Sequence, residues 1–324
     1  MRPYFAMALA FTVSLLPATT FASPTVTVLQ SFDPMLGQLP ESITSDDAGN
    51  LYFSLGGTLN KFTPERQLVT LATIPAPQGA ATLGVKVGPD GFVYVVTAGF
   101  FTAAASAFVW RVSPTGQVSV FATLAADGIP NDLAFDNSGN LFVTDSALGQ
   151  IWKIDRRGNP EVWFADPLLL GDSAHPVAVV RALGANGIAF DQSEHNLYVS
   201  NTDYGRVLRI NLHHGKAQGI DVVAESDLLL GADGIAVDVR GTVYVAVNAA
   251  DRIATVSRSG KISILVEGAP LDAPSSVVFG TRCSDRNTLY FTDYAVLRAS
   301  GAKPGIPSPS LAAVPVPFPG LDLE

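Results

Sequence analysis

Polar residues recur at one position of a repeated phrase in this sequence, and their types suit the binding of a hard cation. The phrase joins a small residue, a polar residue, an apolar pair, an Asp-rich turn with glycine, and then Leu-Tyr-Phe or a close variant. The residues at this polar position are Glu41, Leu83, Asn131, Asn186, Asp233 and Ser275, and Leu83 is the apolar exception among them. Carboxylate and amide oxygens, with no His or Cys among them, suit Ca²⁺ first and Mg²⁺ or Mn²⁺ after it.

The same residues also allow a simpler interpretation that involves no metal. Asn and Asp side chains often hydrogen-bond the turn in which they stand, so each could cap its own repeat. Two carboxylates buried near one another, however, are unfavourable unless a cation neutralises them. The residue types therefore favour a divalent cation, while the capping interpretation stays open.

The spacing of the phrase indicates the architecture that must position these residues. Successive polar positions are separated by 42, 48, 55, 47 and 42 residues. Periods near this length are typical of β-propeller blades with four strands each. We therefore predict an all-β, six-bladed β-propeller over residues 23–300. The polar positions should stand at the starts of the innermost strands, beside the central channel.

Strand patterns recur within each repeat, and their count suggests how the ring closes. The third strands read VWRVS, IWKID, VLRIN and IATVS, and fourth strands such as QVSVFATL follow them. The last repeat, which ends near residues 295–300, lacks a fourth strand, whereas residues 25–32 carry its pattern. We predict that this N-terminal strand closes the last blade, because closure removes exposed sheet edges. The Pro-rich residues 301–324 should form a surface strap outside the repeats.

Four of the polar positions lie in motifs that are similar to those of a known family. PESI at Glu41, PND at Asn131, ANGIAFD at Asn186 and ADGIAVD at Asp233 resemble the gluconolactonase/regucalcin (senescence marker protein) family. That family sits in the calcium-dependent phosphotriesterase superfamily, with paraoxonases and diisopropylfluorophosphatase, and the similarity covers residues 25–300. The resemblance implies a six-bladed propeller with a divalent cation in its channel, bound by Glu41, Asn186 and Asp233. It makes Asn131 either a ligand or a substrate contact.

Such a cation would allow ester chemistry, because few protein ligands leave positions for substrate and water. It could polarise a lactone carbonyl and stabilise the oxyanion that forms on attack. Asp233 is the candidate general base or direct nucleophile, and its alternative role is that of a ligand only. Asp132, next to Asn131, could orient that amide or hydrogen-bond the local turn.

Propeller geometry selects the other residues that could reach the site. His175, in the long segment 168–184, lies on the site face and could contact substrate or move a proton; otherwise it is a plain loop residue. Phe100 and Phe101, in the apolar segment 97–108, could wall a substrate pocket, contact a lipid surface or pack against a neighbouring blade. The rim of the site should include, without assigned roles, Asp145, Ser146, Asn201, Thr202, Asp203, Tyr204, Asn248, Asp293 and Tyr294.

Composition and missing motifs exclude several classes of function. The 324 residues include 20 Lys and Arg against 29 Asp and Glu, for a formal charge of −9. Nucleic-acid binding is not expected, because it needs a basic face. The single cysteine, Cys283, excludes an internal disulfide and a Cys-rich zinc site. The absence of GxSxG, HExxH and GxxxxGK[ST] leaves a serine hydrolase, a zinc protease and a P-loop enzyme without support.

The N-terminus has the layout of a targeting segment. Residues 1–22 combine Arg2, an apolar run to about Leu16, Pro17 and small residues that end at Ala22. This pattern predicts a secretory signal peptide that is cleaved near Ala22, and the alternative is an uncleaved anchor. We expect an exported protein, secreted or periplasmic, without a transmembrane anchor.

The sequence thus predicts an exported, metal-dependent hydrolase that opens a lactone, with Ca²⁺ preferred and Zn²⁺, Mg²⁺ or Mn²⁺ as alternatives. The partner is a small-molecule lactone or ester, and no obligate protein partner is expected. One alternative is a phosphotriesterase-like hydrolase that uses the same metal. Another is a non-catalytic, metal-stabilised binding propeller, because a fold does not determine a function. A third alternative is a strictosidine-synthase-like relative. In such a relative the metal ligands should be lost, so the polar residues at the repeat position count against it.

Overall fold

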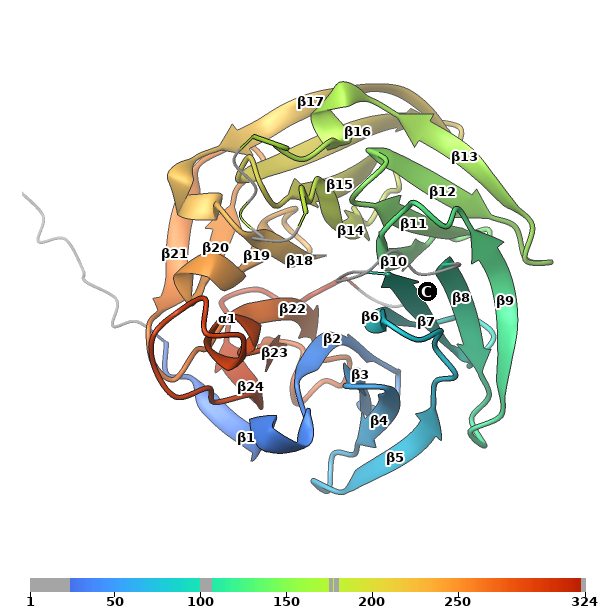
Figure 1. The fold of residues 1–324 in the computed structure, drawn as a ribbon. Helices are drawn as coiled ribbons and strands as arrows, with labels where there is room; N and C mark the ends of the chain where they lie inside the picture. The colour runs from blue at the N-terminus through green and yellow to red at the C-terminus, as the bar shows by residue number, and fades with distance from the viewer. Residues whose placement is uncertain (1–23, 100–106, 175–176, 178–180, 322–324) are drawn as a thin grey trace, which may run out of the picture.

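Six four-stranded antiparallel sheets stand around a central channel in the computed structural model of this protein (Figure 1). The structure describes residues 24–99, 107–174, 177 and 181–321. The expected signal peptide 1–22 and the candidate residues Phe100, Phe101 and His175 lie outside these described residues. The predicted all-β, six-bladed propeller is confirmed.

The first three blades follow one another along the chain, each running from its innermost to its outermost strand. Blade 1 consists of β2 (Pro40–Ser45), β3 (Leu51–Leu55), β4 (Thr58–Phe62) and β5 (Leu68–Thr73). Blade 2 consists of β6 (Ala80–Val87), β7 (Val93–Gly99), β8 (Ala107–Val112) and β9 (Val118–Leu124). Blade 3 consists of β10 (Pro130–Phe135), β11 (Leu141–Asp145), β12 (Gln150–Ile154) and β13 (Pro160–Ala165).

The remaining blades complete the ring, and the last one joins both ends of the chain. Blade 4 consists of β14 (Ala185–Phe190), β15 (Asn196–Asn201), β16 (Arg206–His213) and β17 (Lys216–Glu225). Blade 5 consists of β18 (Ala232–Val237), β19 (Val243–Val247), β20 (Arg252–Val256) and β21 (Ile262–Glu267). Blade 6 consists of β22 (Pro274–Phe279), β23 (Thr288–Asp293), β24 (Ser310–Pro315) and β1 (Thr27–Ser31).

Within the ranges that the structure describes, helical structure is confined to short turns between strands. The 3₁₀ turns are η1 (Pro34–Leu36), η2 (Pro167–Leu169), η3 (Asp227–Leu229) and η4 (Asn248–Ala250), and the α-helix is α1 (Val296–Ala299). None of the helices in the described ranges is long and apolar enough to cross a membrane.

Apolar side chains on facing sheets hold neighbouring blades together. Each of the six blade-to-blade interfaces contains one cluster of buried hydrophobic residues. Between blades 2 and 3, for example, Val96 and Val109 pack with Leu133 and Val143. This arrangement follows from the alternation of the strands, which places every second side chain on the same face of a sheet. A ring of such interfaces lets every blade bury both of its faces.

The N-terminal strand closes the ring as the sequence predicts. β1 pairs with β24 in the last blade, with Thr27 opposite Ala313 and Ser31 opposite Ser310. Figure 1 shows β1, in blue, beside the red strands of the C-terminal part of the chain. The two ends of the described chain are therefore hydrogen-bonded into one sheet.

The predicted role of residues 301–324 as a strap outside the repeats is wrong in one part. Residues 310–315 form β24, the third strand of blade 6, which pairs with β23 along its whole length. Residues 296–299, expected near the end of the last repeat, form α1 instead. The reason lies in Ala295, which has a left-handed backbone (φ 53°) that turns the chain away from the sheet. The Gly- and Pro-rich residues 301–309 separate the apolar strand that follows from the rest of the repeat, so the sequence pattern does not reveal this strand.

We expect Leu311→Ala to test the assignment of β24 as a core strand. Leu311 is 0% exposed and packs in the cluster between blades 6 and 1. Its truncation should lower the free energy of unfolding by about 2–5 kcal/mol, since it leaves a cavity. Equilibrium urea unfolding would measure the change. As the control, Ile306→Ala removes a side chain that is 90% exposed and should alter stability by no more than about 0.5 kcal/mol. Equal effects of the two substitutions would contradict the assignment.

Candidate metal and catalytic site

The polar positions of the repeat stand at irregularities in the innermost strands. In every blade the register between the first and second strands shifts at or beside this position. In blade 4, for instance, the shift falls between Ala185 and Ile188 and leaves Asn186 and Gly187 outside the regular pairing. Such bulges redirect a side chain and are frequent beside active sites. The local backbone thus turns these residues away from the sheet surface.

The four predicted polar residues meet at one small pocket in the channel. The pocket is lined by residues of all six innermost strands, namely Glu41, Ser42, Gly84, Asn131, Asp132, Asn186, Asp233, Gly234, Ser275 and Ser276. Glu41, Asn131, Asn186 and Asp233 are all buried. Leu83, at the same repeat position in blade 2, instead packs in the apolar cluster between blades 2 and 3. The structure therefore brings the sequence-predicted set together from blades 1, 3, 4 and 5.

Hydroxyl groups hold the asparagine amides in one orientation. The Nδ2 of Asn186 donates to Oγ1 of Thr202 over 3.0 Å, and that hydroxyl donates onward to the carbonyl of Ala232 over 2.8 Å. Because a hydroxyl has a single proton to donate, Thr202 must accept from the amide N–H of Asn186. The amide oxygen, Oδ1, then faces away from Thr202. It is buried and has no hydrogen-bond partner.

Asn131 is held by the same kind of relay in blade 3. Its Nδ2 donates to Oγ of Ser146 over 3.2 Å, and Ser146 donates to the carbonyl of Ala185 over 2.6 Å. In both blades the relay ends on the carbonyl that precedes the polar residue of the next blade. Neighbouring blades thus fix which atom of each amide is turned to the hydroxyl.

The two carboxylates lie in an environment that disfavours their charge. Burial, followed by the charges of Asp233 and Asp132, raises the pKa of Glu41 well above its ordinary value. Burial also raises the pKa of Asp233 to about 7, although a 2.8 Å hydrogen bond from Asn248 opposes this shift. The Oε2 atom of Glu41 is buried without a hydrogen-bond partner. No ion pair with Lys or Arg compensates Glu41 or Asp233 within the described part of the chain.

Asp132 is positioned by backbone groups. Its carboxylate accepts from its neighbour Leu133 over 2.8 Å and from the backbone N–H of Ile188, in blade 4, over 3.2 Å. These hydrogen bonds of Asp132 link blade 3 to blade 4, and no hydrogen bond joins its carboxylate to the Asn131 amide in the described residues. Burial raises the pKa of Asp132 to about 6, although the hydrogen bond from Leu133 and the charge of Lys86 oppose this shift.

A larger cavity of about 630 Å³ opens at the other end of the channel. Its wall is mainly apolar and includes Ile43, Leu133 and Ile188, while Asp132 lines both this cavity and the small pocket. Glu41, Asn131, Asn186 and Asp233 do not line it. The groups that could act on a bound ester therefore gather at the narrow pocket rather than at the larger cavity.

In blades 4 and 5 glycine follows the polar position, where neighbouring bulges approach closely. A Cβ at Gly187 would stand 2.5 Å from the backbone oxygen of Asp233, and one at Gly234 would stand 2.7 Å from Cα of Ser276. Both distances are far below normal van der Waals contact, so a larger residue would push the neighbouring strand away. The tight spacing of the ring depends on these glycines.

Comparison with known proteins shows the family to which this chain belongs. The model of a protein family described as the SMP-30/Gluconolactonase/LRE-like region matches residues 39–295. The chain belongs to this family. The matched range begins just before Glu41 and ends after β23, so it includes all of the channel residues described above.

Individual relatives of the SMP-30/gluconolactonase family are distant. A gluconolactonase of Zymomonas mobilis is 31% identical over 125 residues, which cover 37% of this chain and 33% of that protein. A lactonase, Drp35, of Staphylococcus saprophyticus is 26% identical over 209 residues, which cover 62% of this chain and 60% of that protein. The chain thus spans one third to three fifths of the length of these curated relatives. The crystal structure of regucalcin from Agrobacterium tumefaciens, described as a calcium-binding protein, shares the fold with a TM-score of 0.63 and 18% identity, covering 93% of this chain and 98% of that one.

The donor groups of the pocket fit a hard cation. The buried, unpartnered oxygens of Glu41 and Asn186 are what an oxygen-preferring ion would satisfy. Within the described ranges no group of three or more His, Cys, Asp and Glu side chains gathers as a metal site. Asn131 and Asn186 are the amide donors in the pocket that could add to Glu41 and Asp233.

Three residues of the predicted rim, to which the sequence assigns no role, support the pocket. Ser146, Thr202 and Asn248 were expected at the rim, and each hydrogen-bonds the polar residue of its own blade. Each directly follows the second strand of a blade. The signal in the sequence is a short polar residue at this repeat position, but only the structure shows which partner it takes.

We expect Ca²⁺ to stabilise the protein more at high pH than at low pH. The raised pKa of Glu41 and Asp233 means that the cation-free folded state binds more protons than the unfolded chain between about pH 4 and pH 7. Stability should therefore fall as pH rises through this range, and Asp132 and Asp293, with pKa values near 6 and 7, act in the same direction. Bound Ca²⁺ should cancel the part that comes from Glu41 and Asp233.

Calorimetry with and without Ca²⁺ at about pH 5.5 and about pH 8 would measure this effect. The rise in Tm caused by Ca²⁺ should be larger at the higher pH and should disappear in Asp233→Asn. A Ca²⁺ effect that is equal at both pH values, or larger in acid, would contradict the assignment of these carboxylates as cation ligands.

We also expect Thr202→Val to weaken Ca²⁺ binding. The substitution keeps the shape of the side chain but removes the hydroxyl that orients the Asn186 amide. Loss of such a supporting hydrogen bond should reduce metal affinity on the order of 10- to 100-fold, as measured by isothermal titration. Thr255→Val is the matched control, because that hydroxyl bonds the Ser263 carbonyl in the outer part of blade 5. Unchanged affinity in Thr202→Val would show that the relay does not position the amide.

Proposed function

We propose that this protein hydrolyses a lactone with the aid of a divalent cation, Ca²⁺ in the first place. Glu41, Asn186 and Asp233 would hold the cation, and Asn131 would be a further ligand or a substrate contact. The observation that carries the proposal is the pair of buried, unpartnered oxygens on Glu41 and Asn186, in the channel of a propeller of the gluconolactonase family. The names of the curated relatives, a gluconolactonase and a lactonase, support this reaction class.

The role proposed for the cation follows from the general chemistry of metal-assisted ester hydrolysis. When bound, it would polarise the lactone carbonyl and favour the negative charge that develops on its oxygen during attack. The pocket residues supply the rest. Asn248 anchors Oδ2 of Asp233 over 2.8 Å, which holds this carboxylate in place to accept a proton from the attacking water. Asp233 is therefore the general base of the proposed reaction.

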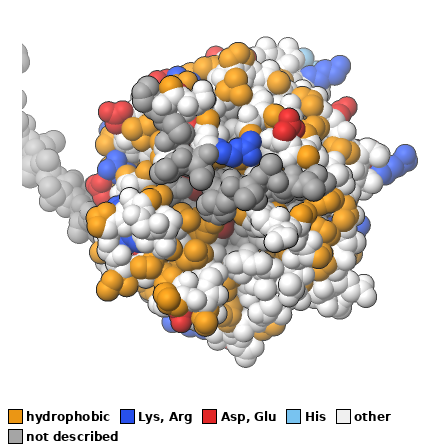
Figure 2. All heavy atoms as spheres, viewed as in Figure 1, with side chains coloured by type: hydrophobic (Ala, Val, Ile, Leu, Met, Phe, Trp, Pro, Cys, Tyr) orange, Lys and Arg blue, Asp and Glu red, His pale blue; other side chains and the backbone are white. Residues whose placement is uncertain are grey.

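Positive charge is not concentrated on the described part of the face in Figure 2, which agrees with an uncharged substrate. Figure 2 shows Lys and Arg side chains standing singly on the viewed face, among larger areas of hydrophobic and uncharged surface. An electrostatic attraction of an anionic substrate would need a concentration of positive charge. A neutral cyclic ester needs none. The export predicted from residues 1–22 stays a separate proposal that rests on the sequence of that segment.

The proposal is tested by a panel of sugar, aliphatic and aryl lactones, followed with a pH indicator. We expect turnover that disappears with a chelator and returns with Ca²⁺. Asp233→Asn should lower kcat by on the order of 10²- to 10⁴-fold, because it removes the proton acceptor. Asp47→Asn, an exposed carboxylate in the β2–β3 hairpin, should leave turnover unchanged.

Two results would overturn the proposal. Turnover that persists after complete removal of the metal would exclude the cation from the reaction. A protein that binds Ca²⁺ but hydrolyses no lactone would exclude a lactonase, and phosphotriesters would then be tested before a purely binding role.

A further inference from the structure

One position of the blades places a side chain next to the polar residues of the channel pocket in blades 3, 4 and 5. It is the residue that follows the second strand, and its N–H donates to the carbonyl just before the innermost strand. This hydrogen bond joins Ser146 to Ile129, Thr202 to Gly184, Asn248 to Gly231 and Tyr294 to Ala273, over 2.8, 3.1, 3.0 and 3.1 Å. The backbone of blade 6 thus presents Tyr294 as blades 3, 4 and 5 present Ser146, Thr202 and Asn248.

The side chain of Tyr294 differs from the other three in what it binds. Ser146, Thr202 and Asn248 each bond the polar residue of their own blade. In blade 6 that residue is Ser275, whose hydroxyl donates to the backbone carbonyl of Glu41. In the part of the chain that the structure describes, the Tyr294 hydroxyl has no hydrogen-bond partner.

Tyr294 is also longer than its counterparts, and its blade lies between the blades of the two pocket carboxylates. Blade 6 lies between blade 5, which carries Asp233, and blade 1, which carries Glu41. A phenol is protonated near neutral pH at its ordinary pKa of about 10. Burial, together with the charges of Glu41 and Asp233, raises the pKa of Tyr294 further. The group is therefore available as an O–H donor.

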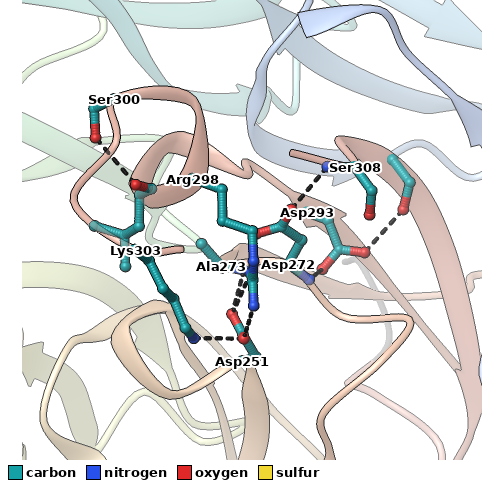
Figure 3. A network of polar contacts seen from close by, with 10 residues as sticks. Asp251, Asp272, Ala273, Asp293, Arg298, Ser300, Lys303 and Ser308 are labelled. Atoms are coloured by element: carbon teal, nitrogen blue, oxygen red, sulfur yellow. Dashed lines mark hydrogen bonds and ion pairs between the residues drawn. The ribbon is translucent and has the colours of Figure 1, made fainter. Parts of the chain in front are cut away.

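A network of buried charges fixes the backbone on both sides of Tyr294 (Figure 3). On the side of β23, Asp293 accepts from the N–H of Asp272 over 3.1 Å and from Oγ of Ser310 over 2.8 Å. On the side of α1, Arg298 pairs with Asp251 over 2.7 Å and with Asp272. The turn that carries Tyr294 is thus attached to blade 5 and to β24. This attachment holds the backbone from which the phenol extends in a fixed position.

We propose that Tyr294 is a catalytic residue whose phenol donates a hydrogen bond to the ring oxygen of the bound lactone. The inference rests on the function proposed above. In the reaction the oxygen of water bonds to the acyl carbon, and the bond from that carbon to the ring oxygen breaks. One hydrogen of the water stays on the new acid group, and the other is taken up by Asp233 and ends on the ring oxygen. Tyr294 stabilises the negative charge on the ring oxygen while that bond breaks.

The test compares Tyr294→Phe with the wild type on an aliphatic lactone, δ-valerolactone, and on an aryl lactone, dihydrocoumarin. For δ-valerolactone kcat should fall on the order of 10²-fold, as for the loss of one donor to a developing oxyanion. The loss should be smaller for dihydrocoumarin, because a phenolate is a better leaving group and needs less stabilisation. The affinity for Ca²⁺, measured by isothermal titration, should not change.

Tyr290→Phe is the matched control, since it removes a phenol hydroxyl from β23, the strand that directly precedes Tyr294. That hydroxyl bonds Asp285 in the hairpin at the far end of β23, so kcat should keep its wild-type value. Three results with an active wild type would overturn the inference: unchanged kinetics in Tyr294→Phe, equal losses on both lactones, or a parallel loss of Ca²⁺ affinity. A wild type that hydrolyses neither lactone would instead overturn the proposed function, and this inference with it.

Discussion

Glu41 and Asp233 are two carboxylates buried in the same pocket with no cationic side chain paired to either within the described residues. Ionising both there is unfavourable, because each loses its hydration and each repels the other. A second acidic cluster in the same molecule shows the contrast. Although burial opposes it, hydrogen bonds from Arg298 and Lys303 lower the pKa of Asp251. The protein thus supplies its own cations to the cluster at the rim and none to the pair in the channel.

The channel pair remains in place because the surrounding backbone and hydroxyl groups are satisfied. Bulges would leave N–H and C=O groups unpaired, and side chains of the second strands take them up. Ser200, for example, accepts from the N–H of Gly187 over 2.8 Å and donates to the carbonyl of Asp233 over 2.6 Å. Each such hydroxyl links two blades. Among the described residues that line the pocket, the buried side-chain atoms without a hydrogen-bond partner are Oε2 of Glu41 and Oδ1 of Asn186. Oxygen atoms held in this way suit a preorganised cation site.

Closure of the ring makes the arrangement of the two channel carboxylates depend on both ends of the chain. Glu41 belongs to blade 1 and Asp233 to blade 5, and blade 6 between them is assembled from β1 and from strands near the C-terminus. The spacing of the two carboxylates therefore depends on the pairing of β1 with β24. The Asp251–Arg298–Asp272 network stabilises the connection between β23 and β24 and, with it, the position of Tyr294. Fold stability and the geometry of the pocket are in this way coupled in one blade.

The sequence by itself determined the ring, its number of blades, its closure by residues 25–32 and the four polar residues that meet in the channel. These features are local: alternating strands, Asp–Gly turns and a fixed repeat position place equivalent residues around one axis. Only the tertiary structure decided the rest. The strand β24 was concealed behind a Gly- and Pro-rich loop, and its assignment depends on pairing with β23. The orientation of the Asn131 and Asn186 amides depends on hydrogen bonds between neighbouring blades, which no repeat unit contains on its own.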